Sequence, residues 1–251
     1  MKTFYKDLRL GILGGGQLGR MLIQESINYN VNTWVLDPDE HAPCKNLCNH
    51  FIVGSLDDYE TVYNFGKQVD LITIEIEKVN IEALEKLESE GVIVYPQSRI
   101  IRIVQDRGLQ KQFFKENNIP SAPFQLISSK EHLLSATIEF PCVQKLRKNG
   151  YDGKGICKLS SVADFEKAFE APSLIEQWID FEKEIAIIVA RNASGETKTF
   201  PCVEMEFNPE ANLVEFLISP AQLDASIVHR AKELAEQLVE SLQYVGILAV
   251  E

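Results

Sequence analysis

Long hydrophobic runs are absent from this sequence. No apolar stretch approaches the ~20 residues that a membrane-spanning helix needs, and the opening segment MKTFYKDLRL lacks the apolar core of a secretory signal. Positive charge is also scarce, because 25 Lys and Arg stand against 37 Asp and Glu, which gives a net charge of -12. This charge repels a nucleic-acid backbone, and no basic patch offsets it. We therefore expect a cytoplasmic protein that binds neither membranes nor nucleic acids.

Cysteine is sparse and irregularly spaced. The five cysteines are Cys44, Cys48, Cys142, Cys157 and Cys202. An odd number without a regular pattern is typical of reduced thiols rather than a disulfide framework. His41 and His50 flank the first two cysteines, but the spacing matches no common zinc motif, so we expect no zinc site.

Strand-like and helix-like segments alternate over roughly the first 95 residues. LRLGILGGG predicts a buried strand entering a glycine turn, LGRMLIQESINY a helix and VNTWVLD a second strand. FIVG, DYETVYNFGKQ, DLITIEIE, IEALEKLESEG and VIVYP continue the alternation. This order favours an α/β domain with a parallel, doubly wound sheet over residues 1–98.

The pattern changes after Pro96. RIIRIVQDRGLQKQFFKENN predicts one long helix that ends near Pro120. Short β-rich runs follow around a glycine-rich segment, and then a helix is expected over Leu223–Leu242, followed by the strand GILAVE. We expect an α+β domain over residues 99–251.

A glycine motif joins the first strand to the first helix. Gly14, Gly16 and Gly19 form GxGxxG, in which small residues let backbone N–H groups approach an anionic ligand. Asp37 at the end of the second strand suits a dinucleotide site. It equally suits the start of the turn DPDE, and the glycines alone fit a tight turn without a ligand.

Carboxylates alternate with isoleucines further along the first domain. Thr73, Glu75 and Glu77 are expected on one face of a strand, near its carboxyl end. Ligands of open α/β sheets bind at that end, where a carboxylate can accept hydrogen bonds from sugar hydroxyls. A solvated strand end is the other interpretation.

The glycine-rich segment of the second domain is its most distinctive feature. Lys145 to Gly155 contains three glycines and four cations, which suits a loop that closes over phosphate groups rather than a plain exposed hairpin. Downstream, Glu176 to Ile179 suits an adenine-binding backbone segment, with Glu184 placed for ribose hydroxyls. Glu251 ends an apolar strand, where it is either a metal carboxylate or simply the last residue given.

An ordered set of motifs spans nearly the whole chain. From the N-terminus they are GGGQLGRM, LDPD, IVGSLDD, ITIEIEKV, VYPQSRIIRIVQDRGLQKQFF, NIPSAPF, GYDGKG and YVGILAVE. In this order and spacing they resemble the N5-carboxyaminoimidazole ribonucleotide synthetase family of ATP-grasp enzymes. The resemblance implies a Rossmann-like pre-ATP-grasp domain over 1–98 and an incomplete ATP-grasp domain over 99–251. It also implies a small lid subdomain at about 121–174.

The resemblance implies a reaction as well as a fold. ATP would phosphorylate bicarbonate to carboxyphosphate, which would carboxylate 5-aminoimidazole ribonucleotide in purine biosynthesis and release ADP and phosphate. Mg²⁺ is the implied metal, and a homodimer is the implied assembly. Cations and Mg²⁺ would offset charge on the transferring phosphoryl group.

Site residues follow from the matching motifs. The implied ATP contacts are Arg107, Lys145, Glu176, Gln177, Trp178, Ile179 and Glu184. The implied ribonucleotide contacts are Gly16, Gln17, Leu18, Glu77 and Tyr151. The implied catalytic residues are Tyr151, Asp152 and Lys154, and Glu251 matches the first of two magnesium-binding glutamates.

The sequence departs from the family in two places. Asn149 and Ile156 stand where the family usually has Gly and Gln, and Asn tolerates the left-handed backbone conformation whereas Ile removes an amide. The family also continues beyond the last residue given, with a second metal glutamate, so we expect the chain as given to be catalytically incompetent. Other ATP-grasp ligases, an NAD-dependent oxidoreductase and a non-catalytic nucleotide-binding protein are the competing interpretations.

Overall fold

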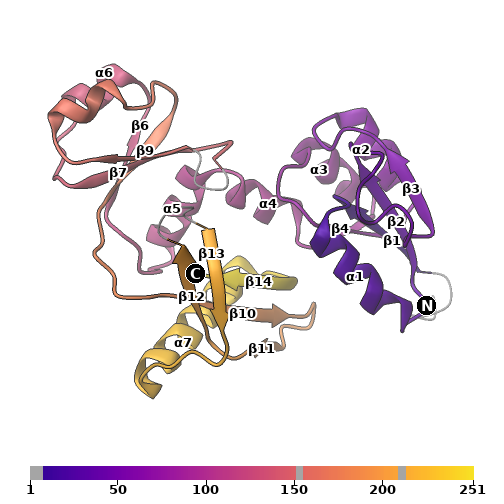
Figure 1. Ribbon diagram of the computed structural model, residues 1–251. Helices are drawn as coiled ribbons and strands as arrows, with labels where there is room; N and C mark the ends of the chain where they lie inside the picture. Colours follow the sequence, from indigo (N-terminus) through magenta and orange to yellow (C-terminus); the bar gives the residue numbers. More distant parts are fainter. Residues whose placement is uncertain (1–7, 151–154, 209–212) are drawn as a thin grey trace. The chain divides into compact units, whose positions relative to one another are not determined.

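The chain forms two compact units, Met1–Arg102 and Ile103–Glu251 (Figure 1). The computed structural model describes residues 8–150, 155–208 and 213–251. Within these ranges, none of the helices combines the length and the apolar character needed to cross a membrane.

A five-stranded sheet forms the centre of the first unit. Its order is β3-β2-β1-β4-β5, and every neighbouring pair is parallel. The strands are β1 (Arg9–Leu13), β2 (Asn32–Asp37), β3 (His50–Val53), β4 (Leu71–Ile74) and β5 (Ile93–Val94). The helices are α1 (Gln17–Ile27), α2 (Tyr59–Gly66), α3 (Ile81–Ser89) and α4 (Ser98–Val104). The predicted doubly wound sheet is confirmed, and its strand order reverses between β1 and β4.

Each face of this sheet is covered by a different set of helices. Ile23 of α1 packs with Ile12 and Val35 on one face. Phe65 of α2 and Leu84 of α3 belong to the larger cluster on the other face, and Figure 1 shows α1 and the α2–α3 pair on opposite sides of the strands. Apolar side chains are thus buried on both faces of the sheet, as is typical of parallel sheets, and the ends of the strands remain as the places where a ligand can bind.

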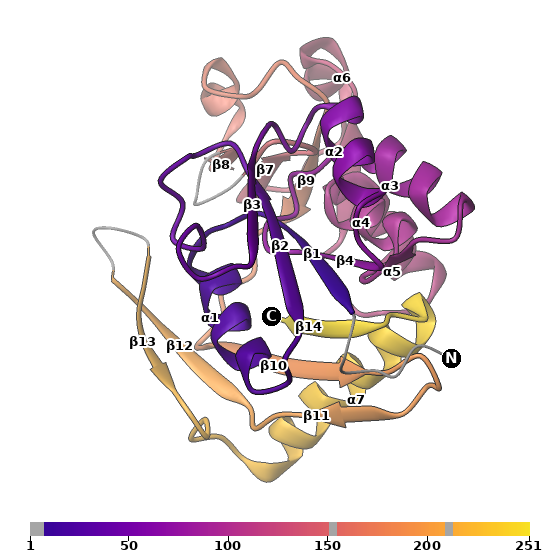
Figure 2. The same cartoon turned by 90° about the vertical axis from the view of Figure 1, so that its right-hand side faces the viewer.

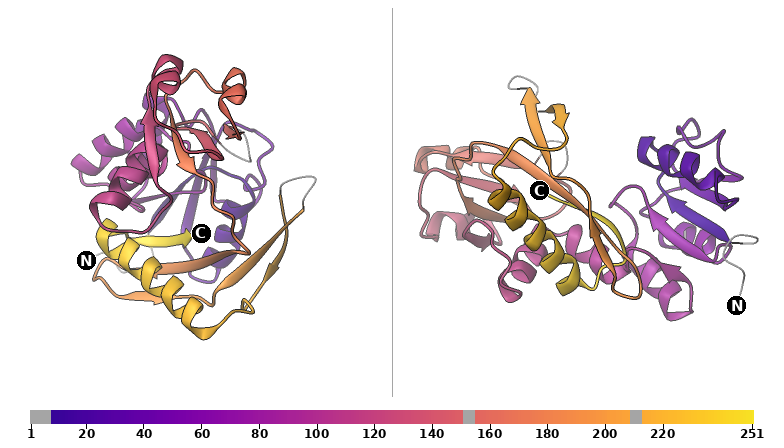
Figure 3. Two further views of the ribbon diagram at one scale, coloured as in Figure 1. Left: turned by 90° about the vertical axis from the view of Figure 1, so that its left-hand side faces the viewer. Right: turned by 90° about the horizontal axis from the view of Figure 1, so that it is seen from below.

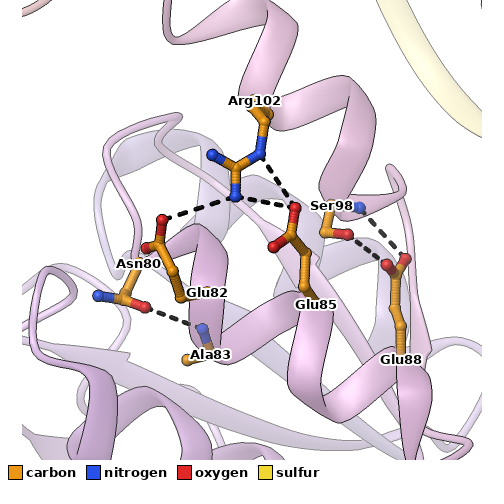
Figure 4. A network of polar contacts seen from close by, with 7 residues as sticks. All are labelled: Asn80, Glu82, Ala83, Glu85, Glu88, Ser98 and Arg102. Carbon is orange, nitrogen blue, oxygen red and sulfur yellow. Dashed lines mark hydrogen bonds and ion pairs between the residues drawn. The ribbon is translucent and has the colours of Figure 1, made fainter.

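Helix α4 is tied to α3 by charged and polar contacts (Figure 4). The guanidinium of Arg102 donates to Glu85 Oε1 through Nε at 3.0 Å and Nη2 at 2.8 Å, and it lies 3.5 Å from Glu82. The Ser98 N–H donates to Glu88 at 3.1 Å, and the Ser98 hydroxyl donates to the same carboxylate. These contacts hold α4 against α3.

Two elements differ from the sequence prediction, one because it is shorter and one because it is divided. Strand β4 stops at Ile74, so Glu75 and Glu77 lie in the bend that follows it rather than on a strand face. The single helix expected after Pro96 is two helices, α4 and α5 (Arg107–Glu116). The break occurs because the Asp106 carboxylate caps α5, accepting from the N–H groups of the second and third residues of that helix.

The second unit contains two sheets. Strands β6 (Phe124–Ile127), β9 (Ser173–Gln177), β7 (Cys142–Leu146) and β8 (Ile156–Leu159) form one antiparallel sheet in that order. It is accompanied by α6 (Lys130–Ser135) and the 3-10 helix η1 (Val162–Glu166).

The other sheet is built around a long strand, β10 (Glu184–Arg191). β11 (Thr197–Thr199) and β12 (Val203–Asn208) pair with β10, β13 (Leu213–Ile218) pairs with β12, and β14 (Gly246–Val250) also pairs with β10. Helix α7 (Ala225–Leu242) runs along this sheet, as Figures 2 and 3 show. The mixed α+β character expected of the second half is confirmed.

Candidate functional site

The glycine loop of the first unit is packed around carboxylates. The Gly15 N–H donates to Asp37 Oδ2 at 2.6 Å, and the Asp39 N–H donates to Asp37 Oδ1 at 2.8 Å. Asp37 therefore organises the loop and the following turn. A Cβ added at Gly16 would lie 2.5 Å from Glu75 Oε1, so the glycine admits this side chain. A dinucleotide phosphate at the loop would meet two carboxylates, which opposes that interpretation.

Three of the residues expected to face a ribonucleotide lie at one edge of the first sheet. Gln17 and Leu18 begin α1, directly after the glycine loop, and Leu18 is 66% exposed. Glu77 is exposed in the bend after β4. β1 and β4 are neighbours, and the strand order reverses between them, so all three residues flank the position where open α/β sheets bind ligands. Glu75, which the resemblance did not assign to the site, lies at the same edge.

Gly16→Ala should destabilise the first unit by about 1–3 kcal/mol, because its methyl group would overlap the Glu75 carboxylate. Urea unfolding followed by circular dichroism measures this loss. In a Glu75→Ala background the same substitution should cost much less. An equal loss in both backgrounds would show that Glu75 is not what requires the glycine.

A buried carboxylate joins two lysines in the second unit. Glu176 of β9 is 8% exposed, and its Oε2 lies 3.4 Å from both Lys145 Nζ of β7 and Lys111 Nζ of α5. Burial lowers the pKa of Lys111, while the Glu176 charge opposes that shift. Lys145 and Glu176 were both expected at the nucleotide site, and the structure brings them together.

Lys111 was missed by the sequence analysis. It follows Arg107 by four residues, so both side chains emerge on the same side of α5. A lysine one helical turn after a site arginine is the signal that could have identified it. Its burial depends on contacts with distant strands, and no local pattern shows them.

The segment after β9 exposes apolar side chains beside a cation. Trp178 is 37% exposed and Ile179 is 49% exposed. The Gln177 N–H donates to the Pro123 carbonyl at 3.0 Å, and the Trp178 N–H is likewise engaged by a carbonyl. Lys158 Nζ of β8 lies 3.6 Å from the centroid of the Trp178 ring. This combination suits a planar apolar base with polar edges.

Glu184 and Glu251 lie close together at the end of the β10–β14 pair. Ile187 pairs with Val250, so one further step in the register places Glu251 opposite Ala186 and diagonal to Glu184. Such diagonal neighbours are about 7–8 Å apart. Burial raises the pKa of Glu184, the Glu251 charge raises it further, and Lys145 counteracts both. The ribose and metal carboxylates expected from the sequence are therefore electrostatically coupled to each other and to Lys145.

Arg107 begins α5 and faces the base of the glycine-rich segment. Its Nη1 donates to the Leu146 carbonyl at 3.0 Å, and its Nη2 donates to the Gly150 carbonyl at 3.2 Å. Asn149 has φ +62°, a left-handed conformation that Asn tolerates. Tyr151, Asp152 and Lys154 lie outside the described residues.

Glu184→Gln should stabilise the second unit at neutral pH. With its folded pKa raised, ionised Glu184 destabilises the fold above that pKa, and this cost fades as acidification protonates the carboxylate. The gain in the midpoint temperature of thermal unfolding should be a few degrees at most and should vanish in acid. The exposed Glu236→Gln on α7 is the matched control. A gain that persists unchanged in acid would contradict the coupling.

Comparisons with known proteins cover both units. Residues 8–105 match the model of the ribonucleotide synthetase preATP-grasp domain, and residues 112–251 match that of the ATP-grasp domain. The N5-carboxyaminoimidazole ribonucleotide synthase of Brucella melitensis biotype 1 is 34% identical over 96% of this chain and 68% of its own length.

Solved structures give the same pattern. The N5-carboxyaminoimidazole ribonucleotide synthetase of Thermotoga maritima is 32% identical, with a TM-score of 0.87 over 97% of this chain and 64% of its own. An Aspergillus clavatus N5-carboxyaminoimidazole synthase, solved with ADP and 5-aminoimidazole ribonucleotide, is 28% identical, with a TM-score of 0.87 over 98% of this chain and 66% of its own. The chain thus spans about two thirds of the length of these relatives.

Proposed function

Because the chain belongs to the N5-carboxyaminoimidazole ribonucleotide synthase family of ATP-grasp enzymes, we propose that the protein carboxylates 5-aminoimidazole ribonucleotide, with ATP and bicarbonate as co-substrates. The observation that carries the proposal is Glu176, buried between Lys111 and Lys145, with Lys145 also coupled electrostatically to Glu184. Cations, an apolar base-binding segment and metal-binding oxygens are the groups that a magnesium nucleotide requires.

ATP would bind the second unit. Lys145 and Arg107 would contact the phosphates, because both present half-buried cations. The adenine would lie on the segment from Glu176 to Ile179, whose exposed apolar side chains it would cover. Glu184 would accept hydrogen bonds from the ribose hydroxyls.

The ribonucleotide would bind the first unit, at the edge where the strand order of its sheet reverses. Gly16, Gln17 and Leu18 would approach it from the start of α1, and Glu77 would accept from its hydroxyl groups. The Asp37 and Glu75 carboxylates around the glycine loop favour a sugar over a phosphate at that position.

The proposed reaction has two transfers. A bicarbonate oxygen attacks the γ-phosphorus of ATP, and ADP leaves with the electrons of the broken P–O bond. The amino nitrogen of the ribonucleotide then attacks the carboxyl carbon of carboxyphosphate, phosphate leaves, and the nitrogen loses a proton. We assign Tyr151, Asp152 and Lys154 to the loop that covers these steps, where exclusion of water protects the acyl phosphate.

The residues present fit a magnesium ion bound together with a nucleotide. Within the described ranges, no cluster of three or more His, Cys, Asp or Glu side chains is arranged to hold a metal. A nucleotide-bound Mg²⁺ takes only one or two protein carboxylates, and Glu251 would supply one of them, with the Glu184 charge nearby adding to the attraction for a cation. When bound, the ion would offset negative charge on the phosphates.

We also propose a cytoplasmic homodimer. The five cysteines are free thiols, which suits a reducing compartment. Leu217 of β13 is 66% exposed and offers apolar surface that a second copy would bury. A single species at the monomer mass in sedimentation velocity would contradict the dimer.

Lys145→Ala should weaken ATP binding about tenfold or more, because it removes a cation that has a charged partner. Isothermal titration calorimetry with MgATP measures the change. Lys130→Ala on α6, which breaks an ion pair between Lys130 and Glu170, is the control and should bind normally. Binding of NAD without binding of ATP would overturn the assignment.

Glu77→Ala should weaken binding of 5-aminoimidazole ribonucleotide about tenfold and leave the affinity for ATP close to that of the unmodified chain, because the two ligands are assigned to different units. Calorimetry with each ligand separately measures both affinities. Glu60→Ala, an exposed carboxylate on α2, is the control. Loss of ATP binding with normal ribonucleotide binding would mean that the two sites are exchanged.

A further inference from the structure

Asp106 and Arg147 form a bidentate ion pair, with the carboxylate buried and the guanidinium half-buried, that none of the assigned roles uses. Arg147 Nε donates to Asp106 Oδ1, and Arg147 Nη2 donates to Asp106 Oδ2, both at 2.8 Å. Asp106 is 4% exposed, and it also accepts from the Gly108 N–H at 2.8 Å and the Leu109 N–H at 3.3 Å. With four donors around it, this carboxylate is fully engaged inside the protein.

The pair fastens two distant segments to each other. Arg147 directly follows β7, within the glycine-rich segment, whereas Asp106 caps α5. The Arg107 N–H donates to the Arg147 carbonyl at 2.9 Å, and the Arg107 guanidinium donates to the Leu146 and Gly150 carbonyls. Arg107 is thus held between its own helix and the segment that the Arg147 side chain anchors.

Gly108 makes room for this arrangement. A Cβ at this position would lie 2.5 Å from Arg147 Nε and 2.8 Å from Cζ. Its φ angle is not in the left-handed region, so packing is what requires the glycine. The Arg147 guanidinium therefore lies directly over the first turn of α5.

We infer that Asp106 and Arg147 are positioning residues of the nucleotide site, which hold the Arg107 guanidinium and residues 146–150 in place for phosphate binding. The inference rests on the proposed assignment of Arg107 to ATP. Neither member of the pair needs to touch the nucleotide, because the pair acts through Arg107 and the backbone beside it. Rigid support of this kind determines how accurately a binding group is placed.

The charge state of Asp106 agrees with this role. Burial alone would raise the pKa of its carboxyl group, but the hydrogen bonds from Arg147 and from two backbone N–H groups lower the pKa below its ordinary value. The carboxylate therefore stays ionised at neutral pH, and the bidentate pair persists there.

The test uses Arg147→Met and Arg147→Lys in the 251-residue chain, each with and without Arg107→Met. Arg147→Met should weaken MgATP binding about tenfold in calorimetry, and Lys, which keeps the charge but not the fork, should restore part of the loss. In the Arg107→Met background, Arg147→Met should have less than about a twofold further effect, because the pair acts through Arg107. Arg9→Met, which breaks a bidentate pair with Asp70 in the first unit, is the matched control and should bind normally.

Hydrogen exchange of the Arg107 and Leu146 amides, measured by NMR without nucleotide, provides a second readout. Both amides should exchange about tenfold faster in Arg147→Met, because each of the two hydrogen bonds has one partner within residues 146–150. Unchanged exchange overturns the inference whatever the ligand does. Faster exchange with normal ATP affinity also overturns it, because the pair would then be structural only. Failure of the unmodified chain to bind ATP would instead overturn the proposed function, and with it the role assigned to the pair.

Discussion

A carboxylate buried between two ammonium groups organises the candidate nucleotide site of the second unit. Glu176 would be strongly destabilising without cations, because burial removes its hydration. The cations come from different elements, Lys145 from β7 and Lys111 from α5, so the helix and two neighbouring strands are tied to one point. If a phosphate draws Lys145 away, Lys111 remains to neutralise the carboxylate. Lys145 can therefore move from Glu176 to a phosphate without leaving the buried carboxylate unpaired.

In the other sheet of the same unit, two carboxylates lie close together without a full complement of cations. Glu184 and Glu251 lie diagonally on paired strands and repel each other, and Lys145 offsets only part of that repulsion. The remaining repulsion between the two carboxylates would be relieved by a bound cation. Excess positive charge beside Glu176 suits the phosphates of a magnesium nucleotide, and the negative charge of Glu184 and Glu251 suits its cation. The pairing of β10 with β14 fixes the spacing of these two carboxylates.

Much of the fold followed from local sequence patterns. Alternating strands and helices in the first half are visible because each helix covers the sheet with its own apolar stripe. The ends of elements were predicted less well. Glu75 and Glu77 continue the alternation of β4 by composition, but the ladder with β1 ends at Ile74. The break at Asp106 was hidden in a helix-compatible run, because its strongest partner, Arg147, is 41 residues away.

The site shows the same division between local and distant information. Lys145, Glu176 and Glu184 were assigned from motifs, and the structure shows how they are coupled. Lys111 could not be predicted in its role, because an amphipathic helix places lysines at its surface and only the packing of β9 against α5 buries this one. Motifs identify residues that contact ligands, whereas the residues that hold those contacts in place depend on tertiary structure.

The glycine loop bears on how Rossmann-like sequences are interpreted. Its spacing is that of a dinucleotide fingerprint, yet the group that comes closest to Gly14 and Gly16 is the protein's own Glu75. Glycines at these positions permit close approach without specifying what approaches. A search for dinucleotide-binding proteins by this spacing alone would therefore include chains such as this one. An acidic residue directly after the adjacent parallel strand would be a useful exclusion criterion, because its side chain fills the volume that a pyrophosphate would need.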